Sequence, residues 1–215
     1  MKKLKMLKNN TKGILISFCG LDGCGKTTII NMVSKELERT GKEIILTKQP
    51  TDWVRTSNIF RNYMDEPDHK NFEYRSLSLL AASDRLQHVN KLIVPALEDG
   101  AIVITDRYFY SCLANLWARG YEHDKWIFEI AKFIVEPDIA FFLDVPVSTA
   151  INRVWKRPEE ADRFVDLALQ YSLRSNYMKI ARQNNGIILS TEEDENKTYC
   201  KVMKFINNVL ERKNG

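Results

Sequence analysis

The chain has 215 residues, of which 44% are hydrophobic and 28% charged, enough for one globular domain with a sizeable core but short for two. Its formal net charge of +4 falls short of a dense basic stripe, so we expect no nucleic-acid partner, while the mild excess suits a small anionic substrate. No apolar run approaches the roughly 18 residues of a membrane span, so we expect no membrane partner either.

The N-terminus and the cysteines indicate a cytoplasmic protein. Residues 1–12 are rich in lysine, but no apolar segment with a small-residue cleavage site follows, so a secretory signal is not expected. We expect this segment to be a flexible basic tail in front of a single domain, residues 13–215. The four cysteines lack zinc-site and CxxC spacings, and free thiols favour a reducing compartment.

Short apolar runs alternate with longer amphipathic stretches along the domain. The runs are rich in Ile, Val and Phe without polar alternation, which predicts strands buried on both faces. We expect these strands at residues 14–19, 43–48, 101–105, 139–143 and 186–190. Helices are expected between and after them, at residues 27–40, 53–64, 71–98, 146–156, 162–183 and 196–211. Strands separated by helices imply right-handed crossovers, so the predicted fold is a three-layer α/β/α sandwich around a five-stranded parallel sheet. Its ligands should bind at the carboxyl ends of the strands.

The segment between the first strand and the first helix carries the strongest functional signal. Its sequence GLDGCGKT fits the pattern G-x-x-x-x-G-K-[ST] throughout. Glycines let successive N–H groups curl toward phosphate oxygens, and the helix that follows adds its positive end. Lys26 can then reach the β- and γ-phosphates, and Thr27 can ligate Mg²⁺. We predict that ATP binds to Gly20, Leu21, Asp22, Gly23, Cys24, Gly25, Lys26, Thr27 and Thr28.

A second polar segment, Thr105-Asp106-Arg107-Tyr108, ends the third strand, and Ser111 follows it. A carboxylate at a strand tip beside the loop can hold the Mg²⁺ shell, and the adjacent arginine can clamp a phosphate. Taken alone, the Asp-Arg pair is equally consistent with a surface ion pair.

Together with the loop, this segment resembles the thymidylate kinase family. In that family an Asp-Arg-Tyr or Asp-Arg-His segment, with Ser three residues later, stands at the same place after the phosphate loop. The resemblance extends over about residues 13–190. It implies transfer of a phosphoryl group from ATP to a nucleoside monophosphate, with dTMP as the first expectation, a requirement for Mg²⁺, and a homodimer.

The resemblance also implies which residues bind the acceptor nucleotide. Arg85, in the long helix before the third strand, matches an arginine that reaches the acceptor base. Asp22 matches an acidic loop residue near the acceptor sugar and phosphate, and Lys48 keeps the positive charge of a Thr-Arg-Glu-Pro-like segment after the second strand. The full expected set is Asp22, Lys48, Gln49, Arg85, Arg107, Ser111 and Asn115.

The basic stretch at residues 153–164 resembles the lid of these kinases. It contains Arg153, Lys156 and Arg157, followed by Asp162-Arg163-Phe164. A lid that closes over ATP excludes water and brings cations to the moving phosphoryl group. Because the loop itself contains no arginine, the lid is expected to supply that charge, although which cation does so stays open. The expected catalytic residues are Lys26, Asp106, Arg153 and Arg157, and the expected Mg²⁺ ligands are Thr27 and Asp106.

The departures from the family pattern gather around the acceptor base. Ala81 stands where the family usually has a stacking phenylalanine, and Asn115-Leu116 stands where it has Tyr or Phe followed by Gln. Gln49 and Val165 replace expected acidic residues. Losing a stacking ring removes roughly 1–3 kcal/mol of base contact unless another ring replaces it. Trp53 and Trp117 are the candidates for that replacement.

These observations leave three alternative functions open and disfavour a fourth. A remodelled base pocket favours a nucleoside monophosphate other than dTMP. A nucleoside kinase would need a general base, for which Asp22 or Asp106 is available, and a non-catalytic nucleotide-binding module would bind ATP without transfer. A GTPase is disfavoured, because neither Asn90-Lys91 nor Asn196-Lys197 has Asp two positions later.

Overall fold

The computed structural model describes residues 3–65, 69, 72–161 and 164–214. Five strands form one sheet in the order β2-β3-β1-β4-β5, and every neighbouring pair is parallel. Each strand lies within one residue of its expected bounds: β1 Ile14–Cys19, β2 Ile44–Lys48, β3 Ile102–Asp106, β4 Ile139–Asp144 and β5 Ile187–Ser190. The predicted five-stranded parallel sheet is confirmed.

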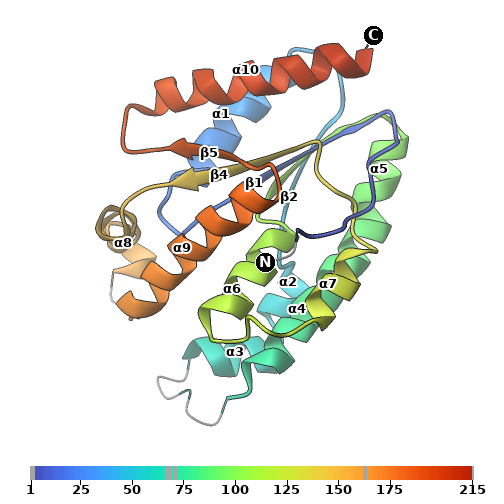
Figure 1. Ribbon diagram of the computed structural model, residues 1–215. Helices are drawn as coiled ribbons and strands as arrows, with labels where there is room; N and C mark the ends of the chain where they lie inside the picture. The colour runs from blue at the N-terminus through green and yellow to red at the C-terminus, as the bar shows by residue number, and fades with distance from the viewer. Residues whose placement is uncertain (1–2, 66–68, 70–71, 162–163, 215) are drawn as a thin grey trace.

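Helices cover both faces of this sheet and complete the predicted three layers (Figure 1). On one face lie α1 (Lys26–Glu38) and α10 (Glu195–Asn214), which pack against each other. The other face carries α4 (Tyr74–His88), α6 (Phe109–Ala118) and α9 (Leu167–Gln183). The shorter helices are α2 Asp52–Arg55, α3 Asn58–Asp65, α5 Val94–Glu98, α7 Trp126–Ala131 and α8 Val147–Trp155. Within the described residues, no helix combines the length and apolar composition needed to cross a bilayer.

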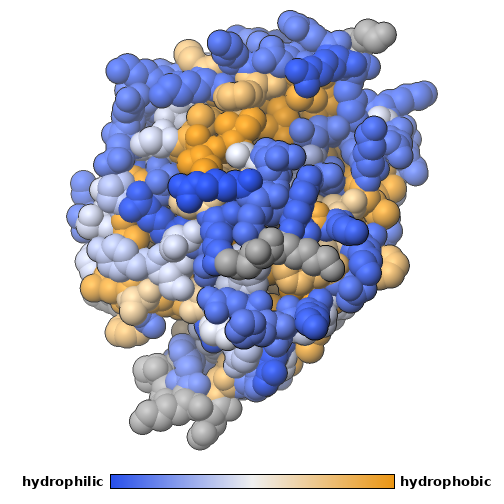
Figure 2. Space-filling model, viewed as in Figure 1, coloured by the Kyte–Doolittle hydropathy of each residue, from blue (hydrophilic) through white to orange (hydrophobic). Residues whose placement is uncertain are grey.

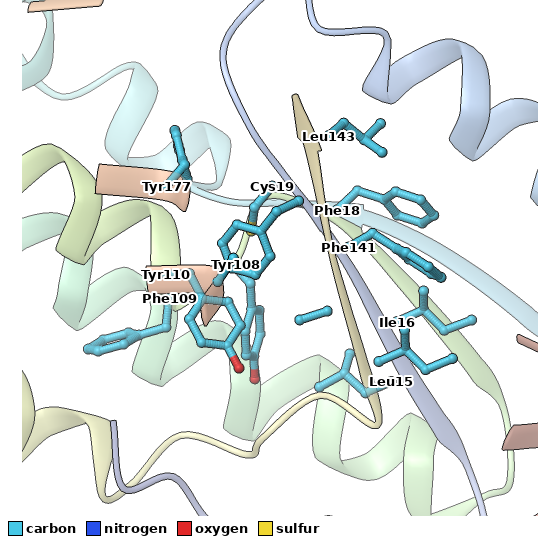
Figure 3. Close-up of a cluster of buried hydrophobic side chains, with 14 of the residues drawn as sticks. Leu15, Ile16, Phe18, Cys19, Tyr108, Phe109, Tyr110, Phe141, Leu143 and Tyr177 are labelled. Carbon is cyan, nitrogen blue, oxygen red and sulfur yellow. The ribbon is translucent and has the colours of Figure 1, made fainter. Parts of the chain in front are cut away.

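The sheet is apolar at its centre because helices exclude water from both of its faces. All six residues of β1 are buried. The rings of Phe18 and Phe141, on neighbouring strands, stack with their centroids 5.1 Å apart. Figure 3 shows these rings on one side of the sheet and Tyr108 and Tyr110 on the other. Such close packing makes the strands a stiff base for the loops at their carboxyl ends.

Two expected helices are interrupted in the structure, each for a local reason. The helix expected at residues 53–64 is divided into α2 and α3, because the Ser57 hydroxyl donates to the carbonyl of Val54 (2.6 Å) and accepts from the N–H of Phe60 (3.2 Å). This hydroxyl therefore caps the new helix. The helix expected at residues 71–98 contains a π-helical turn, Val89–Ile93, just before Pro95, which has no N–H to continue the α-helical ladder.

The N-terminal segment differs from the flexible tail expected for residues 1–12. Leu4 is buried, and its N–H donates to Asn184 Oδ1 at 3.0 Å. Leu7 forms a parallel bridge with Val135. Leu4 and Met6 face the core while the lysines between and around them face solvent, which is the two-residue period of an extended strand. The described residues from 3 onward are therefore tied to the domain.

A hollow of about 510 Å³ lies at the amino ends of β4 and β5, beside α10. Ile187, Phe205 and Val209 contribute to its lining, and apolar side chains gather beneath α10 in the view of Figure 2. Nucleotide sites of open α/β sheets lie at the carboxyl ends of the strands. This hollow is therefore separate from the site that the sequence predicts.

Candidate active site

The loop that follows β1 has the curled backbone that phosphate binding requires. Gly20, Gly23 and Gly25 have φ values of 141°, 80° and 87°. A Cβ on Gly23 would overlap the carbonyl oxygen of Ala150 in α8, so this position accepts glycine alone. Gly25 is the N-cap of α1, which begins at Lys26. The loop thus directs the positive end of α1 toward the carboxyl edge of the sheet.

Lys26 occupies the inside of this curve. Its side chain is 6% exposed, and Nζ donates to the carbonyl oxygens of Leu21 (2.8 Å) and Gly20 (3.3 Å). The thiol of Cys24 is fully buried 3.7 Å from the same nitrogen, so it packs the interior of the loop. In the part of the chain that the structure describes, the hydrogen-bond partners of Nζ are thus groups of the loop itself, which places the cation where phosphate oxygens would bind.

Arg107 connects the tip of β3 to the loop. Its Nη2 donates to Asp22 Oδ1 at 2.5 Å, and its Nη1 donates to the carbonyl of Gly20 (3.2 Å) and to the hydroxyl of Tyr177 (2.8 Å). The Tyr177 hydroxyl in turn donates to Ser111 Oγ at 3.1 Å. Burial acts against the charge of Arg107, but Asp22, Tyr177 and Asp106 outweigh it and hold its pKa well above the usual value. The structure therefore brings Asp22, Arg107 and Ser111 together, as expected.

Asp106 has the chemistry of a metal-shell ligand. Its Oδ1 is buried and has no hydrogen-bond partner in the described part of the chain. Thr27, in the first turn of α1, is exposed and can direct its hydroxyl to solvent or ligand. Mg²⁺ prefers oxygen ligands and commonly takes one or two from protein and the rest from phosphates and water. These two residues fit that ion.

Arg85, which is expected to contact the acceptor, lies on α4. Arg85 is 3% exposed, its Nη1 donates to the carbonyl of Ala81 (2.9 Å), and its Nε has no partner among the described residues. A buried donor left unpaired in this way is costly unless a ligand satisfies it. Asn115 is held in place, since it donates to the carbonyl of Ser111 (2.8 Å) and accepts from Arg119 Nη1 (3.0 Å).

Two side chains at the end of β2, Thr47 and Gln49, face α4 and contact His88 there. Thr47 Oγ1 lies 2.8 Å from His88 Nε2, and Gln49 Nε2 lies 3.0 Å from His88 Nδ1. Burial lowers the pKa of His88 despite the nearby carboxylate of Asp84, so the ring favours its neutral form. Because strand side chains alternate between faces, Lys48 leaves the sheet on the face opposite to α4 and is exposed. The structure thus places Gln49 beside α4 but does not bring Lys48 to Arg85.

The expected lid is described only in part. Arg153, in α8, donates to the carbonyl of Thr191 (2.9 Å) and weakly to that of Gly23 (3.5 Å), so it lies against the outer side of the loop. Arg157 is exposed. Asp162 and Arg163 lie outside the described residues. The structure therefore places Arg153 at the loop, while Lys156 and Arg157 are exposed.

Proteins of a known family are similar to this chain over most of its length. The sequence profile of the family described as thymidylate kinase matches residues 18–201. The probable thymidylate kinase of Thermococcus kodakarensis is 36% identical over 197 residues, which cover 89% of this chain and 96% of that protein. The probable thymidylate kinase of Pyrococcus horikoshii is 41% identical over 174 residues, covering 79% of this chain and 83% of that protein.

The chain belongs to the thymidylate kinase family. A bacterial member, the thymidylate kinase of Geobacillus sp., is 33% identical over 185 residues, which cover 83% of this chain and 87% of that protein. The predicted enzyme class, a nucleoside monophosphate kinase with a phosphate loop, is confirmed.

Within this thymidylate kinase fold, the two tryptophans considered as replacements for the stacking ring differ in burial. Trp117 follows Asn115 by two positions in α6, and side chains at that spacing do not share a helix face. Trp117 is instead buried, with Lys179 Nζ of α9 5.5 Å from its ring centroid. Trp53, on α2, is 62% exposed. Of the two candidates for the stacking ring missing at Ala81, Trp117 is thus packed in the core, and Trp53 is the one accessible to a ligand.

Sequence reasoning missed three polar residues of the site. Tyr177 and Arg174 lie three apart on α9, where Tyr177 supports Arg107 and Arg174 binds both oxygens of Asp144 at the tip of β4 (2.7 and 2.9 Å). Their spacing on one helix face is the only sequence signal, because the packing of α9 against α6 and β4 brings them to the site. The third is Arg55 in α2, which is not part of any motif recognised in the sequence.

Proposed function

We propose that the protein transfers the γ-phosphoryl group of ATP to dTMP and releases ADP and dTDP. One observation carries the proposal: the buried cation of the loop, Lys26, and the Arg107–Asp22 pair meet at Gly20, whose carbonyl accepts from both cations. Donor and acceptor phosphates can therefore meet at one edge of the sheet. The family membership of the chain and the names of its relatives support dTMP as the acceptor.

The chemistry is an in-line displacement. A bond forms between an oxygen of the acceptor phosphate and the γ-phosphorus, while the bond from that phosphorus to the β,γ-bridging oxygen breaks. The acceptor oxygen is already ionised, so alignment and charge neutralisation replace general-base catalysis. This removes the need for Asp22 or Asp106 to act as a base, which a nucleoside kinase would require.

On the donor side, the N–H groups of the loop cradle the β- and γ-phosphates, and Lys26 binds the oxygens that gain charge during transfer. Thr27 and Asp106 would hold Mg²⁺. When bound, this ion neutralises negative charge on the donor phosphates. Arg153 and Arg157 are the lid cations, with Arg153 already in contact with the loop.

On the acceptor side, Arg107 clamps the phosphate from the tip of β3, and Tyr177 and Asp22 hold its guanidinium in place. Arg85, whose buried Nε has no partner among the described residues, is the cation that would contact the acceptor base. Ser111 and Asn115, one turn apart on α6, line the same face of that helix.

Steady-state assays with Mg·ATP and a panel of acceptors test this function. The panel contains dTMP, dUMP, UMP, CMP, AMP, GMP and thymidine. We expect the highest kcat/KM with dTMP and no comparable turnover of thymidine. A higher kcat/KM with another monophosphate would assign the remodelled pocket to that base. Turnover of thymidine alone would identify a nucleoside kinase, and ATP binding without any transfer would identify a binding module.

We further propose that the protein acts as a homodimer in the cytoplasm. Leu79 on α4 is 46% exposed, which an interface with a second copy would cover. All four thiols are free, and three of them are buried, as in proteins of reducing compartments. Sedimentation equilibrium tests the dimer, and a purely monomeric species at micromolar concentration would contradict it.

A further inference from the structure

The proposed function does not use the hollow of about 510 Å³ at the amino ends of β4 and β5. The hollow is there because β5 begins late: its first residue, Ile187, pairs with Phe141. Ile139 and Ala140 of β4 therefore extend beyond β5, and both line the hollow. Helix α10, which packs on β4, forms another wall (Figure 1). A hollow of this volume can take a small organic molecule.

A buried hydroxyl lines the interior of this hollow. Tyr110, in the first turn of α6, is 1% exposed, and its hydroxyl has no hydrogen-bond partner in the described part of the chain. Its neighbour Tyr108 is equally buried but donates to the carbonyl of Val135 at 2.7 Å. Figure 3 shows the two hydroxyl oxygens at the same end of neighbouring rings. Because buried hydroxyls are normally hydrogen-bonded, the Tyr110 hydroxyl indicates a ligand that supplies an acceptor.

The carboxylates at the hollow already have cationic partners. Glu136 Oε1 lies 3.8 Å from Lys3 Nζ. Asp138 Oδ1 lies 3.1 Å from Lys213 Nζ. Burial, and to a smaller extent the charge of Glu136, raises the pKa of the Tyr110 hydroxyl, which therefore keeps its proton and can donate. The negative charge of the hollow is thus matched within the chain, and the tyrosine remains a donor.

Two further cations line the hollow, one from each end of the chain. Lys8 and Arg212 are both exposed. Neither forms an ion pair with a carboxylate in the ranges that the structure describes. Together with the Tyr110 hydroxyl, these two side chains supply donors and positive charge without a matching acceptor. They therefore favour an anionic ligand.

An aromatic ring supplies apolar surface beside these donors. Phe205 of α10 lines the hollow and is 39% exposed. Its ring meets that of Phe141 in a T-shaped contact, with the centroids 6.3 Å apart. Ile187 and Val209 extend the apolar surface, which appears beneath α10 in Figure 2. A ring positioned in this way can pack against a second flat ring on its exposed side.

We propose that this hollow is a second ligand site, which binds a small molecule with a flat apolar ring and an anionic group. The ring packs against Phe205, and the anionic oxygens accept from Tyr110, Lys8 and Arg212. Nucleotides and aromatic carboxylates share this chemistry. The hollow lies at the opposite end of the strands from the candidate active site, so the inference goes beyond the proposed function and does not depend on it.

The test uses 8-anilinonaphthalene-1-sulfonate as the probe, because it is an aromatic anion whose fluorescence rises in apolar surroundings. The full chain is titrated with this probe in the presence of excess ADP and dTMP, which occupy the candidate active site. We expect saturable binding that weakens as salt is added, since Lys8 and Arg212 are exposed charges.

Three variants locate the bound probe. Tyr110→Phe removes only the hydroxyl, so we expect its Kd for the probe to rise about 5- to 10-fold without loss of thermal stability. Arg212→Ala should raise the Kd about three- to fivefold at low salt. Lys204→Ala, which removes an exposed lysine of α10 that does not line the hollow, is the matched control and should bind as the wild type does. Circular dichroism melts establish that each variant folds.

Competition distinguishes the two sources of the ligand. Displacement of the probe by dTTP would assign the site to nucleotides, and displacement by indole-3-acetate would assign it to aromatic carboxylates. The proposal is overturned if binding is not saturable, or if neither Tyr110→Phe nor Arg212→Ala changes the Kd. Because fluorescence is read without turnover, a failure of phosphoryl transfer would refute the proposed function alone.

Discussion

Replacing Lys26 by Ala isolates the electrostatic contribution of the phosphate loop. Lys26 is 6% exposed and its Nζ lies within hydrogen-bond distance of two loop carbonyls, so the ammonium acts from a fixed position. Two unit charges about 4 Å apart at an effective dielectric of about 20 interact by about 4 kcal/mol. At about 1.4 kcal/mol per tenfold in rate, its loss should lower kcat about 10³-fold.

The stability of Lys26→Ala should change little by comparison. The carbonyls of Leu21 and Gly20 lose a donor, which costs about 1–2 kcal/mol, and removing a buried charge offsets part of that cost. Coupled-enzyme assays at saturating Mg·ATP and dTMP measure kcat, and urea titration measures the free energy of unfolding. Lys35→Ala, an exposed lysine on the same helix, is the control. A kcat within threefold of the wild type would refute the assignment of Lys26 to the donor phosphates.

Three further changes probe the loop, the metal and the pH dependence. Gly23→Ala should destabilise the fold by about 2–4 kcal/mol and abolish ATP binding, because the new Cβ meets the carbonyl of Ala150 and φ is 80°. Asp106→Asn should lower kcat about 100-fold and raise the Mg²⁺ concentration at half-maximal rate, because a carboxylate ligand becomes neutral. For His88, the folded-state pKa is lowered from 6.5, so the unfolded chain takes up the proton first and stability should fall as pH drops below 6.5. Above that pH the ring is neutral in both states and contributes no pH dependence.

Each of these changes has a control in the same chain. Gly41 has a similar φ of 73° but nothing within 4 Å of a new Cβ, so Gly41→Ala separates backbone strain from overlap. An equal loss of stability in both glycine variants would contradict the overlap argument. Asp99→Asn, an exposed carboxylate, should leave the Mg²⁺ titration unchanged. His88→Gln should lose the decline in unfolding free energy below pH 6.5, and a persistent decline would assign it to other groups.

Local patterns in the sequence predicted most of the fold. Continuous apolar runs identify strands that are buried on both faces, and each run proved to be a strand. The glycine spacing of the loop identified its curled backbone, because few other residues adopt positive φ there. The break at Ser57 was harder to predict, since it depends on whether a hydroxyl turns back to a carbonyl or faces solvent. The lysines of the N-terminal segment led us to expect a flexible tail, because they obscured the apolar alternation of Leu4 and Met6.

The candidate site was predictable only where its residues share a motif. Asp106 ends β3, Arg107 follows it, and Lys26 lies at the end of the loop after β1, so their meeting at one edge follows from a parallel sheet. Tyr177 and Arg55 carry no motif, and their places depend on how α9 and α2 pack against distant elements.

By itself, the sequence determined the kinase family, the parallel sheet and the curled backbone of the loop after β1, because each depends on contacts or backbone angles local to a short segment. Only the tertiary structure decided on which side of the sheet the cations of β2 and α2 lie. Lys48 and Arg55 are seven positions apart, yet strand alternation sends one to the far face, while the hydrogen bonds from Thr51 to Asp84 hold the turn that carries the other near Asp106. The placement of these side chains depends on long-range packing, which no local pattern encodes.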